Sequence, residues 1–155
     1  SEAFLMVAGQ LKDVDLLIAG EIYEDYEPYL ALLQDSEYKD RVHLHTHFIP
    51  NGAVADYFSV CDLVAQPYKN ATQSGVSQIA YHFDVPMLIT NVGGLSELVP
   101  HGEAGWVCEA NVESIAFGIN SVFEEGYLAG IQEKLPELKK HFSWASMALS
   151  LESRV

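Results

Sequence analysis

The sequence predicts an α/β fold, a Rossmann-like parallel sheet of about five or six strands with helices on both faces. Nearly continuous apolar runs at 14–19, 61–65 and 87–89 have the length and composition of strands that are covered on both sides. Amphipathic segments separate these runs, and such alternation is typical of parallel sheets. A single glycine, Gly20, follows the first run, so the GxGxxG fingerprint of a dinucleotide-binding dehydrogenase is absent.

The composition indicates one globular domain spanning residues 1–155, since 49% of the residues are hydrophobic. The formal net charge is −14 and only eight residues are Lys or Arg, which excludes binding to nucleic acid or an anionic membrane through a basic face. No apolar run reaches the roughly twenty residues of a membrane span. Cys61 and Cys108 lack metal-binding spacing. We expect reduced cysteines and a cytoplasmic protein.

The N-terminal third supplies packing elements. Residues 1–11, SEAFLMVAGQL, predict a helix whose apolar stripe starts without a preceding strand or loop, so we expect the chain to start inside an element. The run 14–19 follows as a buried strand. The segment 24–33 then predicts an amphipathic helix with its acidic residues outward, and we assign it packing alone.

Three histidines alternate in the segment RVHLHTHF. Alternation places His43, His45 and His47 on one face of a strand, where neutral imidazoles could share a metal ion. No carboxylate or cysteine cluster adjoins them in the sequence, and strand packing usually separates such residues. We therefore predict no metal site.

The loop after the run 61–65 is the best candidate for a binding site. A helix over 51–59 precedes this run. In open parallel sheets, ligands bind beyond the carboxyl ends of the strands, and this end carries the segment 66–69. Lys69 is a candidate phosphate partner, and a solvated loop lysine is an equal alternative.

A second helix begins directly after this loop, from Gly75 to Phe83, with Thr72 and Ser74 as candidate caps. The unpaired N–H groups and the dipole of its first turn can bind a phosphate, and Gly75 allows a ligand to approach the backbone closely. The hydroxyls of Thr72 and Ser74 and the amide of Gln73 can hydrogen-bond to phosphate or sugar oxygens. Taken alone, 72–75 is an ordinary capped turn, so the wider sequence must decide.

The next strand, from Met87 to about Asn91, leads into a second glycine-containing loop. Gly93 and Gly94 permit unusual dihedral angles and close backbone approach before a short helix over 95–99. Glu97 could hold a ribose hydroxyl, or could simply complement the helix dipole. We assign the turn 101–105 to the scaffold.

The C-terminal part is predicted to be helical. Asn111 caps a helix that ends near Gly126, Pro136 interrupts the next helical stretch, and Ser143 caps the last helix. An apolar last helix without a covering partner would promote self-association.

The order of these segments resembles the C-terminal, nucleotide-sugar-binding domain of retaining glycosyltransferases with the GT-B fold, of the type called glycosyl transferases group 1. The stretch VPMLITNVGGLSELVPHGEAGWV carries much of the likeness, together with DVDLLIAGE, VADYFSVCDLVAQPY and HFSWASMALSL. The resemblance covers nearly the whole chain. It implies that the family's first strand, with its basic loop, and its acceptor-binding domain lie outside this sequence.

One feature departs from that family. Members carry two glutamates separated by seven residues, one near the donor sugar and one near the ribose. Aligned without gaps from Pro86, these positions are Ala71 and Ile79, and matching Gly75 to the family glycine moves the second to Ala80. Neither carboxylate is present, and the chain resembles a branch with a Gln-Ser-Gly loop.

The resemblance implies which residues contact the donor. The base would lie against His47, Phe48 and Ile49, although a plain strand-end loop explains them equally. The nucleotide-sugar would contact Lys69, Thr72, Gln73, Ser74, Gly75, Val76, Gln78, Gly93 and Gly94.

The implied function is that of the donor-binding half of a retaining enzyme. Such an enzyme moves a sugar from a nucleotide-diphosphate donor to a saccharide or lipid-linked acceptor, without a cofactor, in the cytoplasm or at the inner face of the membrane. We expect no catalytic residue and no appreciable turnover in this chain alone. The alternatives are a nucleotide-sugar epimerase of the same fold and a non-catalytic nucleotide-binding or interaction module. A glycogen-type phosphorylase is disfavoured because no lysine lies in a Gly-rich pyridoxal-binding context.

Overall fold

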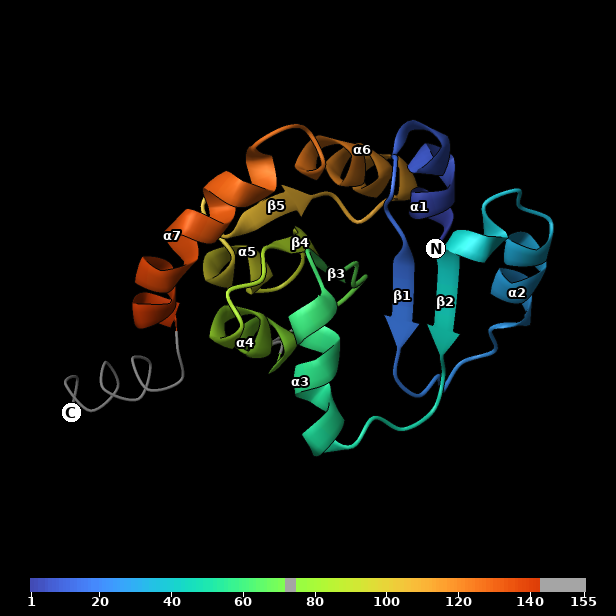
Figure 1. Ribbon diagram of the computed structural model, residues 1–155, viewed down its shortest axis with the longest axis horizontal. Coiled ribbons are helices and arrows are strands. Elements are labelled where there is room, and N and C mark those ends of the chain that lie inside the picture. Colours follow the sequence, from blue (N-terminus) through green and yellow to red (C-terminus); the bar gives the residue numbers. More distant parts are fainter. Residues whose placement is uncertain (72–74, 143–155) are drawn as a thin grey trace.

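The computed structural model describes residues 1–71 and 75–142 (Figure 1). Strands alternate with helices from Leu16 to Val122, as the apolar runs predict, and two helices follow each other at the C-terminal end of this part. In chain order the elements, with η for 3₁₀ turns, are α1 (Glu2–Val7), η1 (Ala8–Gln10), β1 (Leu16–Ala19), α2 (Glu27–Gln34), η2 (Lys39–Arg41), β2 (Val42–His45), α3 (Asn51–Val60), β3 (Val64–Gln66), α4 (Gly75–His82), β4 (Met87–Thr90), α5 (Leu95–Leu98), β5 (Gly105–Cys108), α6 (Val112–Val122) and α7 (Tyr127–Phe142).

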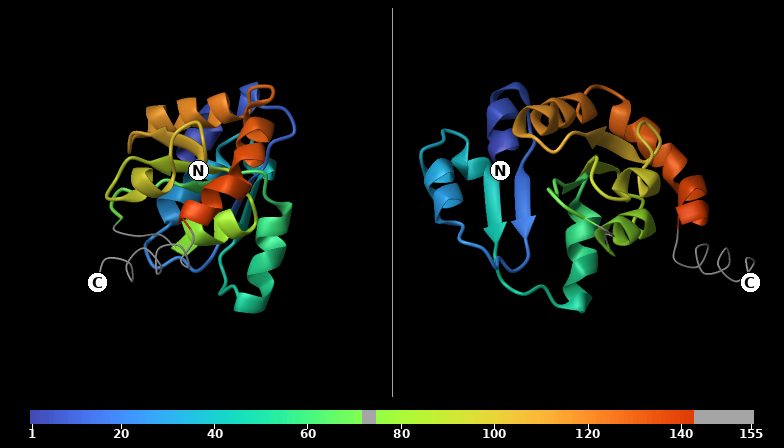
Figure 2. Two further views of the ribbon diagram at one scale, coloured as in Figure 1. Left: turned by 90° about the vertical axis from the view of Figure 1, so that its left-hand side faces the viewer. Right: turned by 180° about the vertical axis from the view of Figure 1, so that it is seen from behind.

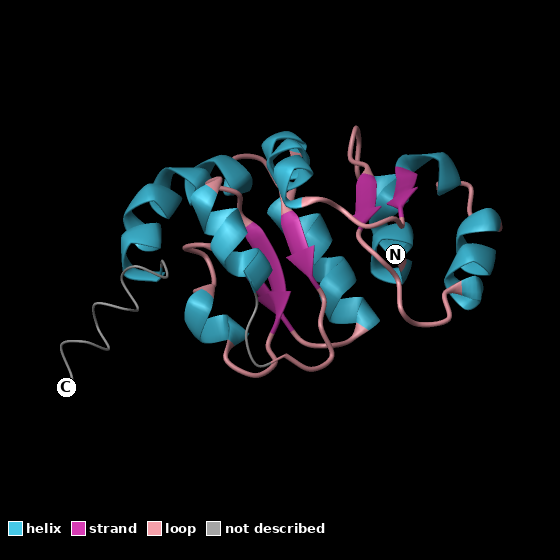
Figure 3. Ribbon diagram, turned by 90° about the horizontal axis from the view of Figure 1, so that it is seen from below, coloured by secondary structure: helices cyan, strands magenta, loops and turns pink. Residues whose placement is uncertain are grey.

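The strands form two parallel sheets. β1 pairs with β2, and β3, β4 and β5 pair in that order. The expectation of one continuous sheet is therefore wrong for the described residues, because no strand among them pairs with both β1 and β3 (Figures 1 and 3). Each sheet keeps the parallel pairing that the sequence predicts.

β4 lies at the centre of the larger sheet and is buried along its whole length. Met87 and Ile89 face a core shared with α4, α5 and α7, while Leu88 faces the opposite side, where Val122 of α6 packs. A strand covered on both sides must be apolar at every position, which explains the continuous run Met-Leu-Ile. The helices thus cover both faces of this sheet (Figure 2).

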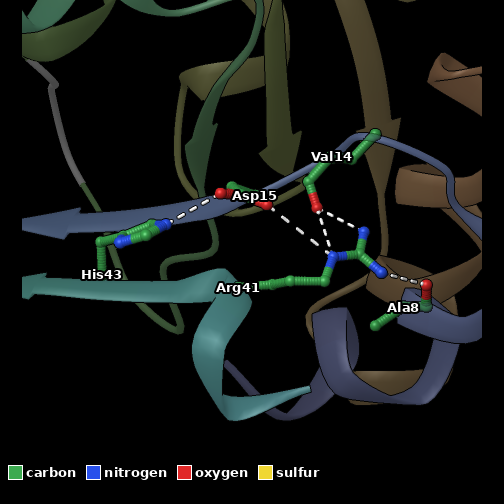
Figure 4. A network of polar contacts seen from close by, with 5 residues as sticks. All are labelled: Ala8, Val14, Asp15, Arg41 and His43. Carbon is green, nitrogen blue, oxygen red and sulfur yellow. Dashed lines mark hydrogen bonds and ion pairs between the residues drawn. The ribbon is translucent and has the colours of Figure 1, made fainter.

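The smaller sheet packs against α1. Phe4 and Val7 of α1 form a second core with Ala116 of α6, and Leu16 and Val42 pack against that core. Arg41 holds the entry to both strands: its guanidinium donates to the carbonyls of Ala8 (2.7 Å) and Val14 (3.0 Å from Nε) (Figure 4).

The ends of several helices follow from local chemistry. The Asn111 side chain accepts from the Ser114 N–H at 2.8 Å, which confirms the predicted cap of α6. α4 ends at His82, and Asp84 follows with a left-handed φ of 53°. The Val85 N–H donates to the carbonyl of Ala80, a common way to satisfy the last carbonyls of a helix.

The prediction that Pro136 interrupts a helix is wrong. α7 runs through it from Tyr127 to Phe142, and Pro136 is exposed on its outer side. Neighbouring core contacts of Ile131 and Leu135 hold the helix together across the hydrogen bond that a proline cannot make. The predicted cap Ser143 and the last helix lie outside the described residues.

Candidate functional site

The carboxyl edge of the larger sheet is the place where the predicted loops meet. β3 and β4 are neighbours, so the loops after Gln66 and after Thr90 leave the same edge. A hydrogen bond joins these loops directly, since the Thr90 hydroxyl donates to the carbonyl of Tyr68 at 2.6 Å. The two segments that the sequence indicates as binding loops are therefore held side by side.

α4 starts at this edge with Gly75. The first N–H groups of a helix have no partner within the helix and carry the positive end of its dipole. Gly75 is exposed, and a Cβ placed on it would meet no atom of the described residues within 4 Å. The predicted cap residues Thr72, Gln73 and Ser74 lie outside the described residues.

A buried polar pair fixes α4 against β3. Gln66, the last residue of β3, and Ser77 of α4 are both almost fully buried, and the Gln66 amide nitrogen lies 3.1 Å from the Ser77 hydroxyl. Buried polar groups need such partners, and the pair ties the first turn of α4 to the end of the strand. Sequence reasoning missed this pair, although a glutamine that ends an apolar run was a usable signal.

In the second glycine loop, Gly93 has the unusual backbone that the sequence predicts, whereas Gly94, with a φ of −93°, does not. Gly93 adopts a φ of 54°, in the left-handed region that favours glycine, and Gly94 precedes α5. The Asn91 N–H donates to the carbonyl of Cys108 at 2.7 Å, which extends the pairing of β4 with β5 beyond the strand. This loop borders the same edge as Gly75.

A hollow of about 400 Å³ opens between α3 and α4 beside Gly75. It runs from the first turn of α3 along one side of α4, so one of its ends lies next to the helix start. Sequence reasoning did not identify the α3 side. The lining residues are Asn51, Val54, Ala55, Gly75, Gln78, Ile79, His82 and Phe83.

The two alignments of the family glutamates place the second position in different surroundings in the structure. Ile79 lines the hollow, whereas Ala80 is completely buried against the core of the larger sheet. Ala71 is half-buried and packs against the same core. The alignment without gaps therefore places the second position in an open site, and the shifted alignment does not.

Lys69 and Gln78, two other predicted contacts of the donor, differ in their hydrogen bonding. Lys69 is exposed in the loop after β3 and makes no hydrogen bond or ion pair with the described residues. Gln78 lines the hollow, but its amide donates to the carbonyl of Phe142 at 2.9 Å. In this arrangement Gln78 joins α4 to the end of α7.

The predicted base-binding segment precedes the hollow. His47 and Phe48 are exposed in the loop between β2 and α3, and Ile49 is half-buried. α3 begins two residues later at Asn51, which lines the hollow. The segment is thus connected to the hollow through the first turn of α3.

The three alternating histidines have different partners. β2 ends at His45, so His47 lies beyond the strand. The His43 ring lies 2.8 Å from a carboxylate oxygen of Asp15 (Figure 4), and the His45 ring lies 2.9 Å from the Tyr57 hydroxyl. The described residues contain no group of three or more His, Cys, Asp or Glu side chains that could hold a metal ion.

Two buried groups near the site keep their protons. Burial raises the pKa of the Cys108 thiol to about 11, and the nearby charge of Glu109 adds to this shift. Burial also raises the pKa of Tyr81, whose hydroxyl donates to the carbonyl of Leu98. Neither group is therefore a thiolate or phenolate nucleophile near neutral pH.

Comparisons with known proteins agree on one family. The family model described as "Glycosyl transferases group 1" matches residues 1–125. The D-inositol 3-phosphate glycosyltransferase of Rhodococcus opacus (strain B4) is 32% identical over 106 residues, which cover 65% of this chain and 24% of that protein. The chain therefore spans about a quarter of this curated relative.

Solved structures show the same fold. The HepE protein of Anabaena in complex with UDP has a TM-score of 0.76 at 20% identity, over 99% of this chain and 45% of that one. The C-terminal domain of the glycosyl transferase group 1 family protein LpcC of Francisella tularensis has a TM-score of 0.75 at 14% identity, over 90% and 74% of the two chains. Within the described residues, no helix is long and apolar enough to cross a membrane.

Proposed function

Because the chain belongs to the glycosyl transferases group 1 family, we propose that it binds the nucleotide-diphosphate-sugar donor of a retaining glycosyltransferase. The complete protein would transfer the sugar to a saccharide or lipid-linked acceptor. The observation that carries the proposal is the exposed start of α4 at the carboxyl edge of the larger sheet, where Gly75 leaves the backbone accessible.

The diphosphate would lie at the first turn of α4. There the N–H groups and the helix dipole favour an anion, and Lys69 is close enough in sequence to add a positive charge. This local attraction has to act against a net charge of −14, so the site depends on short contacts rather than on the overall field. Structural neighbours include HepE in complex with UDP and with UDP-glucose, which supports a nucleotide-sugar as the ligand class.

The nucleoside and the sugar would lie on either side of the diphosphate. The hollow beside α3 offers space continuous with Gly75, and the segment 47–49 shortly precedes Asn51, which also lines the hollow. Gly93 and Gly94 would allow the sugar or phosphate to approach the second loop. In sugar transfer with retention the main demand on this half is stabilisation of the departing diphosphate, which fixed N–H groups provide.

The direct test replaces Gly75 by alanine. In the structure the methyl group fits the fold, because no described atom lies within 4 Å of it, but it projects where the phosphate would approach. We expect the affinity for the preferred nucleotide among UDP, GDP and ADP, measured by calorimetry, to fall about tenfold or more. The chemical shifts of the amides of Gly75 to Ser77 should respond to nucleotide in the parent chain only.

A matched control is Gly130→Ala in α7. Its added methyl also meets nothing within 4 Å, and it lies on a different helix. This variant should bind nucleotide like the unmodified chain. Equal affinities for the Gly75→Ala variant, the Gly130→Ala variant and the unmodified chain would contradict a phosphate site at α4.

A second candidate function is a non-catalytic nucleotide-binding module. It is favoured by Ile79, because an apolar side chain lines the hollow where family members carry a carboxylate. Ile79→Glu and Ala80→Glu in the full-length protein separate the two functions. The first change fits an open site and should preserve or raise sugar transfer, whereas the second buries a charge and should unfold the protein. A full-length protein that binds nucleotide-sugar but transfers no sugar, with or without Ile79→Glu, would favour the module.

A further inference from the structure

One side of α4 lines the hollow along the whole helix. The residues on this side recur at the three- and four-residue spacing of a single helical face. They are Gly75, Gln78, Ile79 and His82. Along the helix axis, Gln78 and Ile79 lie about one turn, or roughly 5 Å, beyond Gly75, and His82 lies about one turn further. A molecule that starts at Gly75 and extends into the hollow therefore meets Gln78 and Ile79 first.

This order of side chains bears on the sugar of a bound nucleotide. The inference rests on the proposed function, in which the diphosphate lies at the first turn of α4. In a nucleoside diphosphate the ribose follows the phosphates directly, and the base lies beyond the ribose. With the phosphates at Gly75, the ribose comes to lie beside Gln78 and Ile79. These two side chains then decide which hydroxyl groups of the sugar find a partner.

Carboxylates are absent from the described lining of the hollow. A ribose carries neighbouring hydroxyls at C2′ and C3′, and in dinucleotide-binding folds an Asp or Glu side chain commonly holds the 2′-hydroxyl. None of the described residues that line this hollow is Asp or Glu. Asp56 and Asp84 adjoin lining residues in the sequence but are not among them, and Asp84 is paired with Lys139 at 3.0 Å. A ribose hydroxyl must therefore find its partner among neutral groups of this lining.

Gln78 supplies one such partner. Its amide nitrogen donates to the carbonyl of Phe142 at 2.9 Å, which fixes the amide and leaves its oxygen to accept from one hydroxyl. The other amide of the lining, Asn51, belongs to α3 and closely follows the predicted base-binding segment 47–49. Gln78 is therefore the amide that lies beside the ribose.

Ile79 makes the rest of this wall apolar. It is half-buried and lines the hollow, whereas the next residue, Ala80, is completely buried in the core. Val54 lines the hollow from α3, and Phe83, which stacks on Phe58 with ring centroids 5.7 Å apart, lines it after α4. A hydroxyl placed against such a surface loses hydrogen bonds to water without gaining a partner, and a methylene group does not.

We propose that the nucleotide site of this protein is selective for 2′-deoxyribose, and that Ile79 sets this selectivity. In the bound nucleotide the 3′-hydroxyl donates to the side-chain oxygen of Gln78, and the C2′ methylene packs against Ile79. A ribonucleotide of the same base and charge places its 2′-hydroxyl against Ile79 and binds less tightly. The substrate class is a sugar linked to a deoxyribonucleoside diphosphate.

The test compares matched nucleotides by calorimetry: UDP with dUDP, GDP with dGDP, and ADP with dADP. The members of each pair share base and charge and differ in the 2′-hydroxyl alone. For the base that binds best, the deoxy form should bind about five- to tenfold more tightly. Equal affinities, or tighter binding of the ribonucleotide, would overturn this proposal and leave the phosphate site at α4 intact. Absence of binding by all six nucleotides would overturn both.

Ile79→Gln tests the residue itself. An amide at this position can hydrogen-bond to the 2′-hydroxyl without changing the charge of the site, so the preference for the deoxy form should disappear or reverse. Val60→Gln is the matched control, because Val60 is also an aliphatic β-branched residue, is exposed on α3 and lies outside the lining of the hollow. It should keep the preference of the unmodified chain. An unchanged preference in the Ile79→Gln variant would overturn the assignment to Ile79.

The position of the sugar is measured separately by NMR. The δ1-methyl signal of Ile79, which is identified by its absence from the Ile79→Gln variant, should shift when the preferred nucleotide is added. Shifts of the amides of Gly75 to Ser77 without a shift of this methyl would place the nucleoside outside the hollow. That result contradicts the selectivity proposed for Ile79 and leaves the phosphate site standing.

Discussion

The two sheets of this protein have similar strand sequences but very different surroundings. β4, with the sequence Met-Leu-Ile-Thr, is completely buried, whereas β1, with the sequence Leu-Leu-Ile-Ala, is half-buried at best. β4 has strands on both sides and helices on both faces, and β1 has one neighbouring strand within residues 1–71 and 75–142. An apolar run therefore predicts the capacity of a strand to be buried, and the number of neighbours decides how much of that capacity is used.

The comparison bears on function because the candidate site draws on both regions. Gly75, Gly93 and the end of β3 belong to the larger, well-packed sheet, which can hold backbone N–H groups in fixed positions. The segment 47–49 follows the smaller sheet. We expect the phosphate-binding part of the site to be more preorganised than the base-binding part.

The largest effect on stability is expected at Gly105, where β5 lies very close to the backbone of β4. A Cβ on Gly105 would lie 1.7 Å from the carbonyl oxygen of Met87, a backbone atom that cannot move without breaking the pairing of β4 with β5. Gly105→Ala should cost roughly 3 kcal/mol of unfolding free energy or more. Urea denaturation followed by circular dichroism measures it.

Gly130→Ala is the control for this change, because its methyl is unobstructed inside α7. It should stabilise the protein by about 0.5–1 kcal/mol, since alanine is the better helix former. A Gly105→Ala variant as stable as the unmodified chain would show that the larger sheet is not as tightly packed as described.

Matched truncations compare the two sheets directly. Leu88 in β4 is completely buried, and Leu17 in β1 is half-buried. Leu88→Ala should cost about 3 kcal/mol through lost burial and a cavity, whereas Leu17→Ala should cost about 1 kcal/mol. Equal costs in urea denaturation would remove the distinction between the regions.

Substitution of Arg41 tests which interactions stabilise the smaller sheet. Its guanidinium donates to the carbonyls of Ala8 and Val14 and lies over the rings of Phe4 (5.6 Å) and Tyr38 (5.9 Å). A lysine cannot reproduce this fork, so Arg41→Lys should cost about 1–2 kcal/mol. Hydrogen exchange should accelerate in β1 and β2 while β4 is unchanged.

Lys140→Arg on exposed α7 is the control for Arg41→Lys, because its ion pair with Glu137 is solvent-exposed and contributes little. Acceleration of exchange in β4 by Arg41→Lys would mean that the two sheets open together, contrary to the regional difference described above.

The sequence predicts most of this fold because its strongest signals are local. The apolar runs, the Asn111 cap and the Gly93 turn all depend on neighbours within a few residues. The structure confirms the cap and the left-handed Gly93, and each apolar run overlaps a strand, although β3 covers only Val64–Gln66 instead of 61–65. The family and the α/β fold are confirmed as well. Pro136 was misassigned because long-range contacts of Ile131 and Leu135 hold α7 together, and sequence alone does not show them.

The candidate site was less predictable for the same reason. The start of α4 at Gly75 follows from local signals, but the hollow beside it is formed by two helices that are separated along the chain. The tie between Gln78 and Phe142 spans 64 positions, so no motif could indicate it. The predicted contacts of Thr72, Gln73 and Ser74 stay predictions, as do the roles of Lys69, Val76 and the segment 47–49.

The smallest expected effect concerns Cys108, at the carboxyl end of β5 in the larger sheet. Cys108 ends β5 and is buried, and burial raises its thiol pKa from 9.0 to about 11. Between these values the folded state keeps a proton that the unfolded state releases, so the stability that it contributes is lost as the pH rises from about 9 to 11.

The Cys108→Ala variant lacks this group and should lose less stability than the unmodified chain over that range. Urea midpoints of both proteins at pH 8, 9, 10 and 11 measure the difference, and Tyr81, Tyr127 and Cys61, whose pKa values are also raised by burial or a nearby charge, contribute equally to both. Parallel pH profiles would mean that solvent reaches the end of β5 in the folded protein. The carboxyl edge that carries the candidate site would then be as accessible to solvent as β2. The difference in burial between the two sheets would hold only for the central residues of their strands.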